Sequence, residues 1–87
     1  MRIVRAAAAG TLESSDALVT VEPGTGIAVS VSSVVEKQFS KAIEQAVRET
    51  LQGLAVTGAS VVVQDRGALD CTLRARVEAA ARRAGEV

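Results

Sequence analysis

The fold of this chain is decided by residues 27–63, IAVSVSSVVEKQFSKAIEQAVRETLQGLAVTGASVVV. Apolar residues at every second position of Ile27–Ser32 predict a strand with one buried face, and Ala59–Val63 is a second short β-branched run. Residues 33–54 between them have the three- and four-residue apolar spacing of an amphipathic helix. A strand, a helix and a strand in this order predict a right-handed crossover with the two strands parallel in one sheet.

The predicted helix has a start signal, an end signal and one apolar stripe. Ser33 and Glu36 have the spacing of a capping box, so the helix is expected to begin there, and Gly53 is expected to end it in a left-handed conformation. Phe39 is the only aromatic residue of the chain, and its truncation to alanine is expected to cost about 3–5 kcal/mol. The stripe comprises Val35, Phe39, Ala42, Ile43, Ala46, Val47, Thr50, Leu51 and Leu54.

Two further strands are expected before this unit. Ala17–Glu22 alternates in the same way as Ile27–Ser32 and predicts a strand. Between them, Pro23 and Gly24 favour a type II turn with positive φ at Gly24, so we expect the two strands to form a hairpin. Residues 3–9 are a weaker strand candidate, because their four alanines suit a helix equally well.

A second helix is predicted over residues 69–84. Asp70 in its first turn and two arginines in its last agree with the helix dipole. Cys71 lies close to the apolar stripe and is expected to be buried, since free cysteine is among the most buried residue types. The alternative is an accessible, reactive thiolate beside Arg74.

These elements predict a single α+β domain over residues 1–87. Both helices have one apolar stripe, so we expect a two-layer sandwich in which a mixed sheet of three or four strands is covered by the two helices on one face. The order of elements is (β)ββαβα, in which the bracketed strand is the candidate at residues 3–9. A chain of 87 residues does not build a second core.

The composition excludes several classes of function. Ten basic residues balance ten acidic ones and aromatics are almost absent, which disfavours nucleic acid as a partner. There is no histidine and only one cysteine, so neither a metal site nor a histidine-based catalytic site is expected. The apolar run near the N-terminus is too short for a signal peptide or a membrane span. We therefore expect a cytoplasmic protein that does not bind membranes.

A polar stretch, Gly10–Asp16, interrupts this apolar sequence. It is predicted to be an exposed turn with Ser14 at or near its tip, because serine and aspartate hydrogen-bond nearby backbone groups in turns. Glu13 and Asp16 flank Ser14, but a carboxylate does not acidify a neighbouring hydroxyl, and no histidine is available as a base. If Ser14 is used chemically, another protein must activate it. The alternative is an ordinary solvated turn.

Three motifs in this chain resemble the acyl carrier protein, or gamma subunit, of citrate lyase. They are Ala9–Asp16 (AGTLESSD), Ser33–Phe39 (SVVEKQF) and Gly67–Ala79 (GALDCTLRARVEA), in the order of the family and spread over nearly the whole chain. The modified residue of the family is the serine after Gly-Thr-Leu-Glu, which corresponds to Ser14. The chain departs from the family at Ser15, where relatives have a glycine.

The resemblance implies a carrier without catalytic residues of its own. Ser14 would be joined through a phosphodiester to phosphoribosyl-dephospho-coenzyme A, whose thiol holds acetyl and citryl thioesters between the alpha and beta subunits of citrate lyase. A prosthetic-group transferase would recognise the flanking loop residues, which are Gly10, Thr11, Leu12, Glu13, Ser15 and Asp16. Two alternatives are the analogous carrier subunit of malonate decarboxylase and an unmodified structural subunit of an enzyme complex.

Overall fold

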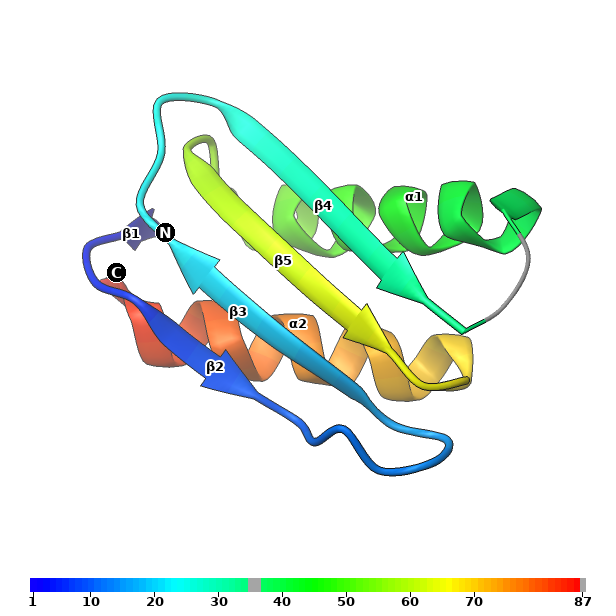
Figure 1. The fold of residues 1–87 in the computed structure, drawn as a ribbon. Coiled ribbons are helices and arrows are strands. Elements are labelled where there is room, and N and C mark those ends of the chain that lie inside the picture. The colour runs from blue at the N-terminus through cyan, green and yellow to red at the C-terminus, as the bar shows by residue number, and fades with distance from the viewer. Residues whose placement is uncertain (35–36, 87) are drawn as a thin grey trace.

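The computed structural model describes residues 1–34 and 37–86 (Figure 1). The elements follow the order βββαβα, with one very short strand added at each end of the described chain, and this confirms the predicted α+β class. The elements are β1 (Arg2–Ile3), β2 (Ala7–Ala9), β3 (Ala17–Glu22), β4 (Ile27–Ser33), α1 (Lys37–Gly53), β5 (Ala59–Asp65), α2 (Asp70–Ala84) and β6 (Gly85–Glu86).

The main sheet has four strands in the order β2-β3-β5-β4. The β2/β3 and β3/β5 pairs are antiparallel and the β4/β5 pair is parallel, so the sheet is mixed as expected. Figure 1 shows both helices on the same face of this sheet, which confirms the two-layer arrangement. The short strands β1 and β6 pair with each other beside the two chain termini.

The expected hairpin between β3 and β4 does not form. β5 lies between these strands, with Val19 opposite Val63 on one side and Val29 opposite Val61 on the other. The connection therefore passes over the end of β5 and needs no tight reversal. In the described chain, the glycines with positive φ are Gly10 and Gly67, so the type II turn predicted at Gly24 is also wrong.

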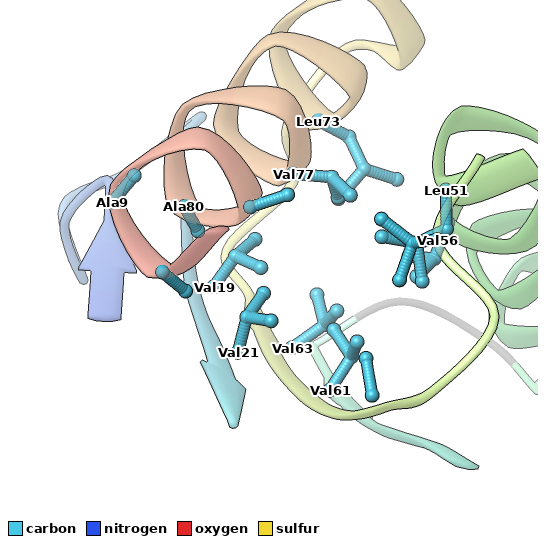
Figure 2. Close-up of a cluster of buried hydrophobic side chains, with 14 of the residues drawn as sticks. Ala9, Val19, Val21, Leu51, Val56, Val61, Val63, Leu73, Val77 and Ala80 are labelled. Carbon is cyan, nitrogen blue, oxygen red and sulfur yellow. The ribbon is translucent and has the colours of Figure 1, made fainter. Parts of the chain in front are cut away.

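The core lies between the sheet and the helices (Figure 2). The inner faces of β3 and β5 contribute alternate residues, and the helices contribute the facing side chains. Because no element of the described chain covers the other side of the sheet, the side chains that point outward from these strands are not buried; Leu18 and Val62 are the large apolar ones among them. The fully buried side chains of largest volume are Leu51, Val19, Val21, Val47, Val61, Val63 and Val77.

Helix α1 begins and ends differently from the prediction. Ser33 belongs to β4, and its hydroxyl donates to Asp65 Oδ2 at 2.8 Å, while Glu36 lies outside the described residues and the predicted capping box with it. Gly53 is the last helical residue, and the left-handed conformation is taken by Ala55, with φ of 57°. The chain leaves the helix through a wider turn, in which the Val56 N–H donates to the Leu51 carbonyl.

The prediction that Phe39 belongs to the core is wrong, because 52% of it is exposed. The buried part of the α1 stripe consists of Ile43, Ala46, Val47 and Leu51, whereas Ala42 is exposed like Phe39. The apolar stripe therefore runs about one turn beyond the part of the helix that the sheet and α2 cover.

The prediction that Cys71 is buried is also wrong. Helix α2 does begin at Asp70 and ends with Arg82 and Arg83 in its last turn, as expected. Its buried residues include Leu73 and Val77, but a step of two residues from Leu73 back to Cys71 turns by about 200° around a helix. Cys71 therefore lies on the opposite face, where its thiol is exposed.

Candidate attachment site at Ser14

Ser14 lies on the loop that connects β2 to β3, at one end of the sheet (Figure 1). Residues 11–15 are all exposed, and Ser14 and Ser15 form a turn, which confirms the exposed turn predicted there. The Ser14 hydroxyl makes no hydrogen bond with residues 1–34 or 37–86. It is therefore free to react with a group from outside the chain.

Asp16 anchors this loop to helix α2. Its Oδ1 accepts from Arg76 Nε at 2.9 Å and its Oδ2 from Arg76 Nη2 at 3.1 Å, so the ion pair is bidentate. Only 13% of the Asp16 side chain is exposed, against 40% for Arg76. Two shorter bonds complete the set: the Thr11 hydroxyl donates to Oδ2 at 2.8 Å and the Ala17 N–H to Oδ1 at 2.7 Å. A planar bidentate pair of this kind fixes orientation as well as distance.

The same contacts determine the ionisation state of Asp16. Hydrogen bonds from Arg76, Ala17 and Thr11 hold the pKa of Asp16 well below its usual range, with the Arg76 bond the largest cause. The pKa of Arg76 is raised in turn by Asp16. Asp16 therefore stays ionised and engaged at neutral pH, and it is not a base for Ser14.

Backbone hydrogen bonds hold the other side of the loop. The Ser15 N–H donates to the Arg66 carbonyl at 2.8 Å, and the Arg66 N–H donates to the Asp16 carbonyl at 2.9 Å. These bonds continue the antiparallel β3/β5 pairing past its last partners, Ala17 and Asp65. Ser14 is thus exposed at the tip of a loop that is bonded to the domain on two sides.

Two loop residues have left-handed backbone conformations. Gly10 has φ of 97°, and a Cβ atom at this position would collide with the Ala17 carbonyl, so a glycine is required. Ser15 has φ of 66°, a region that glycine occupies without strain. A glycine at this position, as expected for the family, would suit the observed backbone at least as well as the serine.

The arrangement has no catalytic apparatus of its own. The other carboxylate of the loop, Glu13, is exposed, and Asp16 is occupied by Arg76. The part of the chain that the structure describes contains no cluster of three metal-ligating side chains. What the loop can do is present a hydroxyl group in a fixed position.

Arg76 is the residue that the sequence analysis missed. It lies 60 positions from Asp16, and nothing in the local sequence of α2 distinguishes it from the other arginines of the helix. The sequence held one indirect signal. An aspartate such as Asp16 that becomes partly buried in an otherwise exposed loop needs an oppositely charged or hydrogen-bonding partner.

Comparison with known proteins identifies the family of this chain. The family model described as malonate decarboxylase delta subunit (MdcD) matches residues 4–84. The citrate lyase acyl carrier protein of Haemophilus influenzae (strain PittGG) is 54% identical over 97% of this chain and 88% of its own length. The corresponding protein of Klebsiella pneumoniae is 57% identical over 92% of this chain and 84% of its own. The chain belongs to the citrate lyase acyl carrier protein family.

The fold of this family member also has a counterpart among solved structures. A chain in the crystal structure of a Pseudomonas malonate decarboxylase hetero-tetramer in complex with malonate matches with a TM-score of 0.78, covering 98% of this chain and 93% of that one. The sequence identity of 21% limits this likeness to the fold. No helix in the described parts of the carrier protein is long and apolar enough to span a membrane.

We expect Asp16→Asn to weaken the acid dependence of stability. The pKa of Asp16 is lowered in the folded state, whereas an aspartate in an unfolded chain has a pKa of about 3.9. The ion pair with Arg76 therefore stabilises fully above that pH, and its contribution is lost as the pH falls toward the folded-state pKa. Melting curves followed by circular dichroism from neutral to acid pH should show a shallower acid loss for the variant.

The control is Asp70→Asn, which removes an exposed i,i+4 partner of Arg74. Exposed pairs of this kind contribute little to stability. If Asp70→Asn lost as much acid dependence as Asp16→Asn, the Asp16–Arg76 pair would contribute no more to stability than an exposed surface pair.

Proposed function

We propose that this protein is the acyl carrier subunit of citrate lyase and that phosphoribosyl-dephospho-coenzyme A is attached to Ser14 Oγ. The observation that carries the proposal is the exposed, unengaged Ser14 hydroxyl on an anchored loop. The loop also has the sequence that the family resemblance assigns to the modified serine. This function requires no catalysis by the chain itself.

The residues present suit a phosphodiester-linked group. Exposed neighbours at positions 11–13 and 15 leave space around the hydroxyl, and the exposed Glu13 is the nearest unpaired charge in the loop. Attachment from a triphosphorylated donor forms one bond between Ser14 Oγ and phosphorus and releases pyrophosphate. The hydroxyl proton must pass to a base of the transferase, because the chain has no histidine and Asp16 is held by Arg76.

The prosthetic group, when bound, supplies the thiol on which acetyl and citryl thioesters are carried. The residues of this chain supply position. The Asp16–Arg76 pair and the bonds of Ser15 and Asp16 to Arg66 fix the base of the arm relative to the domain. Tethering in this way turns encounters between the acyl group and the alpha and beta catalytic subunits into events at high effective concentration.

The alternative carrier is the corresponding subunit of malonate decarboxylase. The matching family model bears that description, and the crystal-structure counterpart comes from that enzyme. Identity favours citrate lyase, because the two carriers of that enzyme named above are 54% and 57% identical to this chain and the malonate decarboxylase chain is 21% identical. An unmodified structural subunit is the remaining alternative.

The function is tested with a Cys71→Ser protein produced in cells that contain the citrate lyase modifying enzymes. Cys71 is the only cysteine and is exposed, so this variant has no thiol of its own. We expect its intact mass to increase by one prosthetic group and one reactive thiol to appear per chain. An unchanged mass and no thiol would support the unmodified structural subunit instead.

A further inference from the structure

Five large apolar side chains are exposed among the described residues: Leu12, Val34, Phe39, Val62 and Leu69, with exposed fractions from 41% to 69%. Four of them lie at the end of the domain that bears Ser14, and the fifth, Val62, lies on the open face of the sheet. Figure 1 shows why they gather: the β2–β3 loop, the end of β4 and the β5–α2 turn all lie at the same end of the molecule.

Hydrogen bonds link the segments that bear these side chains. The loop of Leu12 is bonded through Ser15 and Asp16 to the backbone of Arg66, three residues before Leu69. Asp65, next to Arg66, accepts from the Ser33 hydroxyl beside Val34. We call the surface formed by Leu12, Val34, Phe39 and Leu69 the apolar end.

Asp65 links two of the segments that form the apolar end. Only 3% of this residue is exposed, and its carboxylate accepts from the N–H groups of Gly67 and Ala68 at 3.2 Å and 3.0 Å as well as from Ser33. The β5–α2 turn is therefore held to the end of β4. The surface is preorganised, which lowers the entropy cost of binding a partner.

A pocket opens in this end beside the exposed ring of Phe39. It has a volume of about 240 Å³ and lies between the first turns of α1 and α2, with Ile43, Ala68 and Leu73 among its walls. A pocket of this kind can receive one apolar side chain of a partner, which is the usual form of a binding hot spot.

Electrostatic attraction contributes little to binding at the apolar end. Asp16 is paired with Arg76 and Asp70 with Arg74, and Glu13 and Arg66 carry opposite charges. The described residues of this end therefore present no strong field of one sign, and apolar contact is the main attraction that they offer.

We propose that the apolar end is the docking surface for the prosthetic-group transferase, with Leu69 and Phe39 as its principal contacts and the pocket as the site of an anchoring side chain. This inference rests on the proposed function. The transfer reaction takes place on Ser14 Oγ itself, so the transferase must cover the surface around Ser14 while the bond to phosphorus forms. The catalytic subunits react with the thiol that the prosthetic group carries and not with the Ser14 oxygen itself.

The test measures transfer to apo-protein by a citrate lyase prosthetic-group transferase, with the triphosphorylated donor and mass detection. We expect Leu69→Ser and Phe39→Ser each to lower kcat/KM by about tenfold or more, as removal of an interface hot spot does. The loss should appear in KM with kcat nearly unchanged, because the variants alter docking and not the reacting hydroxyl.

Val62→Ser is the matched control, because it removes an exposed apolar side chain, 41% exposed against 52% for Phe39 and 69% for Leu69, from the open face of the sheet. It should be modified within about twofold of the wild-type rate, and all three variants should melt close to wild type because the side chains are exposed.

Three results would overturn the proposal: equal rates for all variants, an equal loss for Val62→Ser, or unchanged transfer combined with reduced turnover of the assembled, modified lyase. The last result would assign the apolar end to the catalytic subunits. Failure of the transferase to modify the wild-type protein would instead contradict the carrier function itself.

Discussion

Ser14→Ala is expected to abolish attachment of the prosthetic group and to leave the fold unchanged. The variant removes the oxygen atom to which phosphorus must bond, so the loss of modification should be complete. The Ser14 side chain is exposed and makes no hydrogen bond with the described chain, and changes at such positions usually alter stability by less than about 0.5 kcal/mol. Incubation with transferase and donor, followed by intact mass measurement, provides the readout.

Ser15→Ala is the matched control, since it removes the neighbouring hydroxyl from the same turn. Its contribution to the loop is a backbone N–H donated to Arg66, which alanine retains. This variant should therefore still gain one prosthetic group. Normal modification of Ser14→Ala, or loss of modification in Ser15→Ala alone, would show that the wrong serine has been assigned.

The second large effect is expected at Leu51, the bulkiest of the fully buried side chains. Leu51 is 1% exposed and lies on the face of α1 that packs toward the sheet and α2 (Figure 2). Leu51→Ala leaves a cavity in a core made mainly of alanine and valine, and such changes cost about 2–5 kcal/mol. In a domain with a total stability of about 5–15 kcal/mol, this is a large fraction of the free energy of unfolding.

Phe39→Ala is the informative comparison, because residue size alone would rank it as the more damaging change. Its side chain is half exposed, so we expect a cost below about 1 kcal/mol. Urea unfolding followed by circular dichroism measures both variants under the same conditions. A larger loss for Phe39→Ala than for Leu51→Ala would contradict the core that the structure shows.

The two helices and three of the four strands of the main sheet could be predicted from local sequence. Residues 3–9 suit a helix equally well in local sequence, and the structure divides them between β1 and β2. Alternation in Ala17–Glu22 and Ile27–Ser32 identified two of the strands, and the crossover through α1 correctly predicted the parallel pairing of β4 with β5. These features depend on periodicity and chirality within one segment, which need no knowledge of distant residues. The exposure of Ser14 followed in the same way from its turn sequence.

Strand order and side-chain burial depended on tertiary packing. The Pro23-Gly24 pair suggested a hairpin, but β5, with four buried residues, pairs with both β3 and β4 and so takes a central place in the sheet. Phe39 and Cys71 have the local features of core residues, yet the helices are covered over only part of their length and circumference. How far a helix is covered depends on where its partners end.

What the sequence by itself determined is the two helices, the strands β3, β4 and β5, and the exposed serine loop, because each depends on residues close together in the chain. Only the tertiary structure decided which residues hold that loop in place. Arg76 reaches Asp16 from 60 positions away, and Arg66 meets Ser15 and Asp16 because β5 lies beside β3. These partners lie far apart in the chain and are brought together only by the fold, so no local pattern in the sequence records the contact.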